Sequence, residues 1–156
     1  MARPVDEAWR RGVRLGIDVG LVRIGVARCD PDGILASPVA TVSRTRSPTV
    51  MPSPDMAEIK RLVDEYGAIE VIVGLPVTLA GTERHAAAAT RAYVADLKKV
   101  IDPVPVRFAD ERMSTVVAAR RLSDRGVRGR RQRTVVDQAA AVEILQSWLD
   151  AQRRRT

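Results

Sequence analysis

The sequence predicts a single α/β domain, in which an antiparallel meander of three strands leads into strands that alternate with helices. Its 156 residues suffice for one hydrophobic core and are too few for two ordinary domains. Residues 13–42 show the two-residue hydrophobic period of strands, whereas the later apolar segments are separated by helical periods. Strands that are separated by helices favour parallel pairing, so we expect a mixed sheet.

The first two strands are expected to form a hairpin with one apolar face. In the first strand, residues 13–19, apolar side chains recur at every second position, so we place the core on that face. Asp18 then lies on the opposite face. The second strand, Arg23–Cys29, carries Gly25 and Ala27 on the side of Asp18, which makes this face unusually shallow.

A turn and a third strand complete the meander. The segment 30–33 reads Asp-Pro-Asp-Gly, which is typical of a type I turn with proline second and glycine fourth. Residues 34–42 should therefore return as an antiparallel strand. The next segment, residues 43–54, is rich in Ser, Thr, Arg and Pro and is expected to be a mobile loop.

The remaining elements follow from hydrophobic period and from residues that begin or end helices. They are a helix from about Asp55 to Tyr66, a buried strand Ile69–Gly74, a helix from about Arg84 to Val100, a strand Val104–Phe108, a helix from Ser114 or Thr115 to Gly126, and a last helix from Thr134 to about Gln152.

Charge and composition favour a nucleic-acid partner. The chain has 26 Lys and Arg against 19 Asp and Glu, a net charge of +7. The small residues near Asp18 would then let a phosphodiester backbone come close.

A single cysteine, Cys29, excludes an internal disulfide and a cysteine zinc cage, although a bridge between two copies stays open. No apolar run is long enough to span a membrane and no signal peptide is evident, so we expect a cytoplasmic protein.

Acidic residues within apolar segments are the candidates for chemistry. An ionised carboxylate in a buried strand, such as that of Asp18, costs roughly several kcal/mol of folding free energy unless it has a partner. Asp110 and Glu111 follow a predicted strand, and Asp137 lies on the stripe of the last helix that faces the sheet. Such acids can converge at one edge of the sheet, and Mg²⁺ or Mn²⁺ prefers oxygen ligands of this kind. Two such ions could activate water and stabilise a leaving oxygen.

Each acid also has a purely structural explanation. Asp137 is three residues after Thr134, so it could close a capping box at the start of the last helix. Asp110 and Glu111 could stabilise a following helix through its dipole. His85 begins a predicted helix and is expected to be a surface residue rather than a general base.

Four motifs, in order along residues 14–150, resemble the RuvX/YqgF family. They are Gly16-Ile17-Asp18-Val19-Gly20 with Arg23-Ile24-Gly25-Val26-Ala27; Val73-Gly74-Leu75-Pro76 with Gly81; Asp110-Glu111-Arg112-Met113-Ser114-Thr115; and Asp137-Gln138-Ala139-Ala140-Ala141 with Ile144-Leu145-Gln146. One departure is the segment 77–81, which lacks the polar pair that family members usually carry after Gly-Leu-Pro.

The resemblance implies a ribonuclease-H-like fold similar to RuvC resolvases, with a five-stranded mixed sheet flanked by helices on both faces. It implies a divalent-metal phosphodiesterase site in which Asp18, Glu111 and Asp137 bind Mg²⁺ or Mn²⁺, with Asp110 as their neighbour. Arg23 and Arg112 match motif arginines that would bind phosphates.

The basic segment before Asp137 is a further candidate for phosphate binding. Its members are Arg128, Arg130, Arg131 and Arg133, and their place beside an active-site acid favours binding over a solvated loop. We expect residues 1–12 to be a disordered extension, residues 13–150 to be the nuclease domain, and residues 151–156 to be a basic tail.

The resemblance leaves two substrates open, the 5′ end of precursor 16S rRNA and the four-way DNA junction, and we rank the ribosomal RNA first. A resolvase must act as a dimer, whereas no dimer-forming stripe is evident here, so we expect a monomer or weak homodimer. The first motif also resembles the phosphate-binding strand of sugar kinases and actin-like ATPases, but those need a second lobe. A catalytically silent binding domain is the third alternative, which the three retained acids disfavour.

Overall fold

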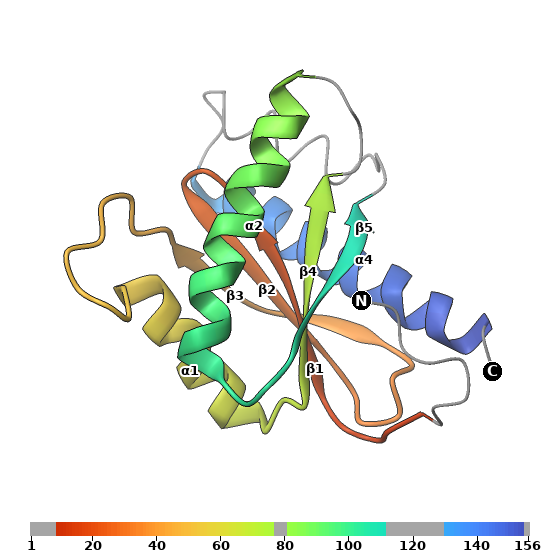
Figure 1. Cartoon of the computed structure of the whole chain (residues 1–156). Coiled ribbons are helices and arrows are strands. Elements are labelled where there is room, and N and C mark those ends of the chain that lie inside the picture. Colours follow the sequence, from red (N-terminus) through yellow and green to blue (C-terminus); the bar gives the residue numbers. More distant parts are fainter. Residues whose placement is uncertain (1–8, 77–80, 112–129, 155–156) are drawn as a thin grey trace.

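The structure is a computed structural model that describes residues 9–76, 81–111 and 130–154, without the side chains of residues 81–83, 110–111 and 130–134. Five strands form one mixed sheet in the order β3-β2-β1-β4-β5 (Figure 1). The elements are β1 (Arg14–Val19), β2 (Arg23–Cys29), β3 (Ala36–Ser43), α1 (Pro54–Tyr66), β4 (Glu70–Pro76), α2 (Gly81–Ile101), β5 (Val106–Glu111) and α4 (Arg130–Arg154). The expected mixed five-stranded sheet is confirmed, and the predicted helix at 114–126 lies outside the described residues.

The meander forms as the sequence predicts. Strand β1 pairs antiparallel with β2, which sets Asp18 opposite Gly25, and β2 pairs antiparallel with β3. The turn between β2 and β3 closes through the Gly33 N–H, which donates to the Asp30 carbonyl at 2.9 Å. Gly33 has a φ of +70°, a conformation that glycine adopts at low cost.

Parallel pairing begins after the meander. Strand β4 lies parallel to both β1 and β5, so β1, β4 and β5 end at the same end of the sheet. Strand β5 extends to Glu111, three residues beyond the predicted limit at Phe108, because its ladder with β4 continues as far as Pro76. Helix α2 likewise starts at Gly81 rather than near Arg84.

Each face of the sheet has its own hydrophobic core. Leu15 and Ile17 pack with α1 and α2 on one face, in a cluster that includes Ile59 and Leu97. The other face is covered by α4, which runs across all five strands (Figure 1). This arrangement confirms helices on both faces of the sheet.

The small residues beside Asp18 serve helix packing, which corrects the expected approach by a phosphodiester backbone. A Cβ atom on Gly25 would lie 2.0 Å from the Asp137 carbonyl oxygen, and one on Gly16 would lie 2.6 Å from the Leu145 Cβ. Ala27 is fully buried in the same cluster as Leu145. The absence of side chains therefore brings the backbone of α4 directly onto β1 and β2.

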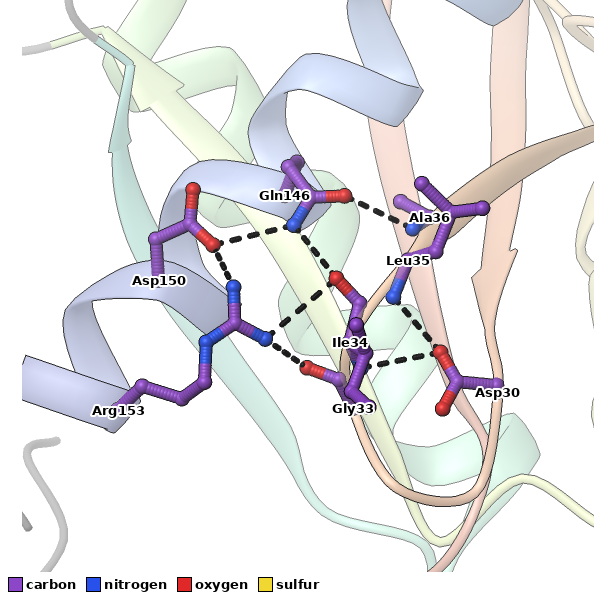
Figure 2. Close-up of polar contacts among 8 residues, drawn as sticks. All are labelled: Asp30, Gly33, Ile34, Leu35, Ala36, Gln146, Asp150 and Arg153. Atoms are coloured by element: carbon purple, nitrogen blue, oxygen red, sulfur yellow. Dashed lines mark hydrogen bonds and ion pairs between the residues drawn. The ribbon is translucent and has the colours of Figure 1, made fainter.

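Helix α4 is longer than predicted at both ends. It begins at Arg130 rather than Thr134, so part of the basic segment is helical, and it ends at Arg154, past the expected start of a tail. Figure 2 shows that Arg153 and Gln146 hold the turn between β2 and β3. The Arg153 guanidinium donates to the Gly33 carbonyl at 2.6 Å, and the Gln146 amide donates to the Ile34 carbonyl at 2.9 Å. These contacts explain why the end of the helix stays ordered.

Residues 9–12 also have defined contacts, although a disordered extension was expected there. The Trp9 ring lies 3.8 Å from the guanidinium carbon of Arg14, which is fully buried. Arg14 pairs with Glu70 at 3.0 Å, and Arg107 donates to the same carboxylate at 2.5 Å. Trp9 therefore covers a buried ionic network at the end of the sheet where β1 begins.

The structure also places Cys29 and His85, for which the sequence raised a bridge between copies and a general base. Cys29 is 1% exposed, so the folded chain does not present it for a bridge between copies. Burial also raises the pKa of its thiol. His85 is exposed on α2, as expected of a surface residue. Within the described residues, no helix has the length and apolar content required to cross a bilayer.

We predict that Gly25→Ala destabilises the protein by about 3 kcal/mol or more, because the added methyl group must displace the α4 backbone. Urea unfolding measures the loss. Gly67→Ala is the matched control, since nothing lies within 4 Å of its Cβ position and only its φ of +60° opposes the change. Equal costs for the two variants would contradict the close contact at Gly25.

Candidate functional site

The predicted acids gather at one end of the sheet. Strands β1, β4 and β5 end there, and β2 begins there, because β2 runs antiparallel to β1. Helix α4 crosses this end near its own start (Figure 1). The site is therefore formed by strand termini and by the first turns of a helix.

Asp18 lies near the end of β1 and is 3% exposed. It is opposite Gly25 in the hairpin, on the strand positions that alternate with Leu15 and Ile17. Since the cluster with Leu15 and Ile17 is on the α1 and α2 side, Asp18 is on the side of α4. This confirms the face that the sequence predicts for it.

Asp137 comes to the same place from α4. It is fully buried, and its carbonyl oxygen is the atom that lies over Gly25, the residue opposite Asp18. The alternative in which Asp137 caps the helix is wrong, because α4 begins at Arg130 and Asp137 lies about two turns inside it. A carboxylate in a helix interior makes no capping box, so its burial needs another reason.

Arg23 provides one part of that reason. Its Nε atom lies 2.5 Å from the Asp137 Oδ2 atom, and its side chain is 16% exposed. Arg23 is the first residue of β2, four positions after the end of β1 at Val19, and the Gly20 N–H donates to its carbonyl to close the turn. The sequence predicts a phosphate contact for Arg23, whereas the structure gives it a buried carboxylate partner.

Glu111 and Asp110 are placed by their backbone alone. Asp110 lies opposite Leu75 and Glu111 lies opposite Pro76, at the carboxyl end of β5. One strand, β4, separates them from β1, which corresponds to roughly 10 Å across the sheet. Their backbone is thus at the end of the sheet that holds Asp18, as the sequence predicts.

The predicted phosphate-binding arginines are only partly described. Arg130, Arg131 and Arg133 belong to the first turn of α4, upstream of Asp137, and their side chains are outside the description. Arg112 and Arg128 lie outside the described residues, as do positions 77–80 of the departing segment. Their roles remain predictions.

One basic residue at this end escaped the sequence analysis. Arg44 directly follows β3, whose last residue, Ser43, is paired with Arg23. Its guanidinium donates to the Gly20 carbonyl at 2.8 Å, within the turn that follows Asp18. No motif marks it, because a single arginine in a polar loop resembles any solvated residue.

The donor set suits a hard divalent cation. Asp18 and Asp137 offer carboxylate oxygens, the ligands that Mg²⁺ and Mn²⁺ prefer. Both residues are buried, and a bound cation would reduce the cost of burying their charges. Among the side chains that the structure describes, no three His, Cys, Asp or Glu residues form a potential metal group, and Glu111 is not among those side chains.

Comparison with family models and with curated proteins gives two descriptions, a junction resolvase and an rRNA nuclease. A family model described as "RuvX: Holliday junction resolvase" matches residues 12–151. A protein of Rhodococcus opacus named "Putative pre-16S rRNA nuclease" is 56% identical over 154 residues, covering 97% of this chain and 85% of its own. A protein of the same name from Nocardia farcinica is 60% identical over 141 residues, covering 90% and 78%.

A solved structure supports the fold. The chain of T. thermophilus RuvC, determined in complex with a Holliday junction substrate, superposes with a TM-score of 0.53 and 14% sequence identity. The match covers 92% of this chain and 97% of the RuvC chain. At this identity the likeness concerns the fold alone.

We predict that Arg23→Gln destabilises the protein by about 3 kcal/mol, because it leaves the Asp137 carboxylate buried without its guanidinium partner. Asp137→Asn should cost less, since Arg23 reaches solvent. The double variant should be more stable than Arg23→Gln alone, as measured by urea unfolding of all four proteins. Strictly additive losses would show that the ion pair contributes nothing.

Proposed function

Because the chain belongs to the RuvX family, whose model spans residues 12–151, we propose that it is a nuclease that hydrolyses phosphodiester bonds of precursor 16S rRNA. The observation that carries this proposal is the burial of two acidic residues beside the single residue Gly25: Asp18 is its partner in the hairpin, and the backbone carbonyl of Asp137 lies over it. Acidic side chains buried at the end of a sheet are costly to keep ionised and are typical of a site that binds a cation. We further propose that the reaction takes place in the cytoplasm.

We propose that Asp18, Asp137 and Glu111 bind Mg²⁺ or Mn²⁺. When bound, such ions activate water and stabilise the leaving oxygen of a phosphodiester. The chain's own contribution is to fix the carboxylates: β1 holds Asp18, α4 holds Asp137, and β5 brings the Glu111 backbone to the same end. Asp110 would be a neighbour of this set rather than a member.

Arg23 has a positioning role in this proposal. Its ion pair with Asp137 orients one carboxylate oxygen, Oδ2, and so directs the other oxygen away from Arg23. A fixed carboxylate loses little conformational freedom when it binds a ligand. Arg23 can also contact a phosphate through its exposed edge, as the family motif implies.

The arginines before Asp137 would bind the substrate backbone. Arg130, Arg131 and Arg133 are consecutive or nearly so in the first turn of α4, and Arg128 and Arg112 belong to the neighbouring segment. Each contact with a phosphate releases counterions and strengthens binding at low salt. Placed next to an acidic centre, they would hold the phosphodiester against the charge repulsion of the carboxylates.

A second candidate is resolution of four-way DNA junctions, which the description of the matching family favours. The same chemistry serves both substrates, so the difference lies in binding and in symmetry. Paired incisions require two active sites related by a two-fold axis. We rank precursor rRNA first because relatives that are 56% and 60% identical to this chain over the aligned residues carry that name.

We predict that Asp18→Asn, Glu111→Gln and Asp137→Asn each abolish metal-dependent cleavage while the protein stays folded at 25 °C, because each removes a ligand charge without opening a cavity. Cleavage of precursor rRNA in Mg²⁺ and in Mn²⁺ is the assay, and circular dichroism checks the fold. Asp64→Asn, an exposed acid on α1, is the matched control and should cleave normally. Cleavage by the Asp18 variant at the rate of the unmodified protein would refute the proposed site.

We predict a protein that is mainly monomeric in reducing buffer and cuts precursor RNA in that state. Sedimentation velocity, paired with cleavage of precursor rRNA and of a synthetic four-way junction over a range of protein concentrations, measures both properties. Junction cleavage should appear only at concentrations that drive dimerisation. A tight dimer that makes symmetrical cuts in the junction and leaves RNA intact would reverse the ranking of the two substrates.

A further inference from the structure

Arg44 is held rigidly at the end of the sheet that contains Asp18. Its backbone N–H donates to the Val22 carbonyl at 2.8 Å, and its guanidinium donates to the Gly20 carbonyl at 2.8 Å. The guanidinium carbon also lies 5.0 Å from the centre of the Tyr93 ring. A guanidinium held by two contacts has already lost part of the side-chain freedom that binding would otherwise cost.

The loop that carries Arg44 is anchored by a buried carboxylate, contrary to the mobile loop that the composition predicts. Asp55 is 2% exposed and accepts hydrogen bonds from the Thr45 N–H at 3.1 Å, the Ser53 hydroxyl at 2.5 Å and the Tyr93 hydroxyl at 3.1 Å. Burial by itself raises the pKa of the Asp55 carboxyl, but these bonds and one from the Met56 N–H hold it below its usual value. Asp55 therefore stays ionised and fixes both ends of the loop.

The partners of the Arg44 guanidinium differ from those of the other anchored arginines. Arg14, Arg23 and Arg107 each pair with a buried carboxylate. Within the ranges that the structure describes, Arg44 forms no ion pair, and its partners are a neutral carbonyl and an aromatic ring. The Asp55 carboxylate accepts its hydrogen bonds from Thr45, Ser53 and Tyr93 instead. A half-buried guanidinium held only by neutral groups keeps its charge available for an anion.

Arg44 contacts the turn that directly follows β1 and Asp18. Gly20, its hydrogen-bond partner, is two residues after Asp18, so their Cα atoms are at most roughly 7 Å apart. Arg23, at the other end of the same turn, is occupied by Asp137. Arg44 contacts Tyr93 of α2, so it lies on the α2 side of the turn. Arg23 pairs with Asp137 of α4, so it lies on the α4 side. The two arginines therefore lie on opposite sides of the turn that follows Asp18.

From this placement we propose that Arg44 binds a phosphate of the substrate backbone next to the one at the carboxylates, with Asp55 and Tyr93 as positioning residues. The inference rests on the proposed nuclease function and adds a substrate contact that the family motifs do not include. A phosphate would receive the guanidinium donors that the Gly20 carbonyl does not use. The contact is to the backbone, so it would not depend on base sequence.

The test is binding of a fluorescein-labelled single-stranded RNA by Arg44→Gln, measured by anisotropy in EDTA over a range of salt concentrations. We expect the affinity to fall by about tenfold. The slope of log affinity against log salt should become shallower by about 0.7, the value for one lost contact on a single strand. Arg61→Gln is the matched control, because it removes the same charge from α1, where Arg61 pairs with Glu58 and Glu65. It should keep the original slope.

Three results decide the matter. An unchanged salt slope for a folded Arg44→Gln protein, as judged by thermal unfolding, overturns the contact while the nuclease proposal stands. If the unmodified protein binds neither the RNA nor a four-way junction, both proposals fail together. If Arg44→Gln does not fold, the Arg44 Nε–H signal of the unmodified protein is followed by NMR. The proposal requires that signal to shift on addition of RNA, and a static signal overturns it.

Discussion

The contact between the backbone of α4 and Gly25 is the constraint on which the rest of the structure depends. A glycine at the centre of the β1–β2 hairpin lets the Asp137 carbonyl occupy the space where any other residue has its Cβ atom. Gly16 allows the same close approach one strand away, against Leu145. These two contacts fix the distance of α4 from the sheet and the rotation of the helix about its own axis. Its buried residues, Ile144 and Leu149 among them, then complete the second core.

That constraint has an electrostatic consequence. Once α4 rests on Gly25, Asp137 cannot avoid the neighbourhood of Asp18, because Gly25 is the partner of Asp18 in the hairpin. Two carboxylates brought together away from water raise the free energy of the folded state unless positive charge compensates them. Arg23, held by the turn between the same two strands, supplies positive charge to Asp137. The divalent cation proposed for this end of the sheet would lower that cost further.

The sequence allowed the hairpin and the face of Asp18 to be predicted because a strand has a strict two-residue period, which a single run of alternating residues reveals. The purpose of Gly16, Gly25 and Ala27 was misjudged, since small residues are equally suited to a ligand and to a packed helix, and only the tertiary structure distinguishes them. The start of α4 was placed four residues late, because Thr134 resembles an N-cap whereas Arg130 to Arg133 carry no capping signal. Arg44 was missed because its fixed position comes from Gly20, Val22 and Tyr93, which are distant in the sequence.

If Asp18 and Asp137 form one cation site beside Gly25, anomalous diffraction from crystals soaked in Mn²⁺ will locate it. An anomalous peak should lie within about 2–2.5 Å of carboxylate oxygens from both residues, a distance typical of divalent cations with oxygen ligands. The peak should vanish in crystals of Asp18→Asn. Manganese bound elsewhere, with Asp18 and Asp137 free of it at saturating concentration, would refute this site.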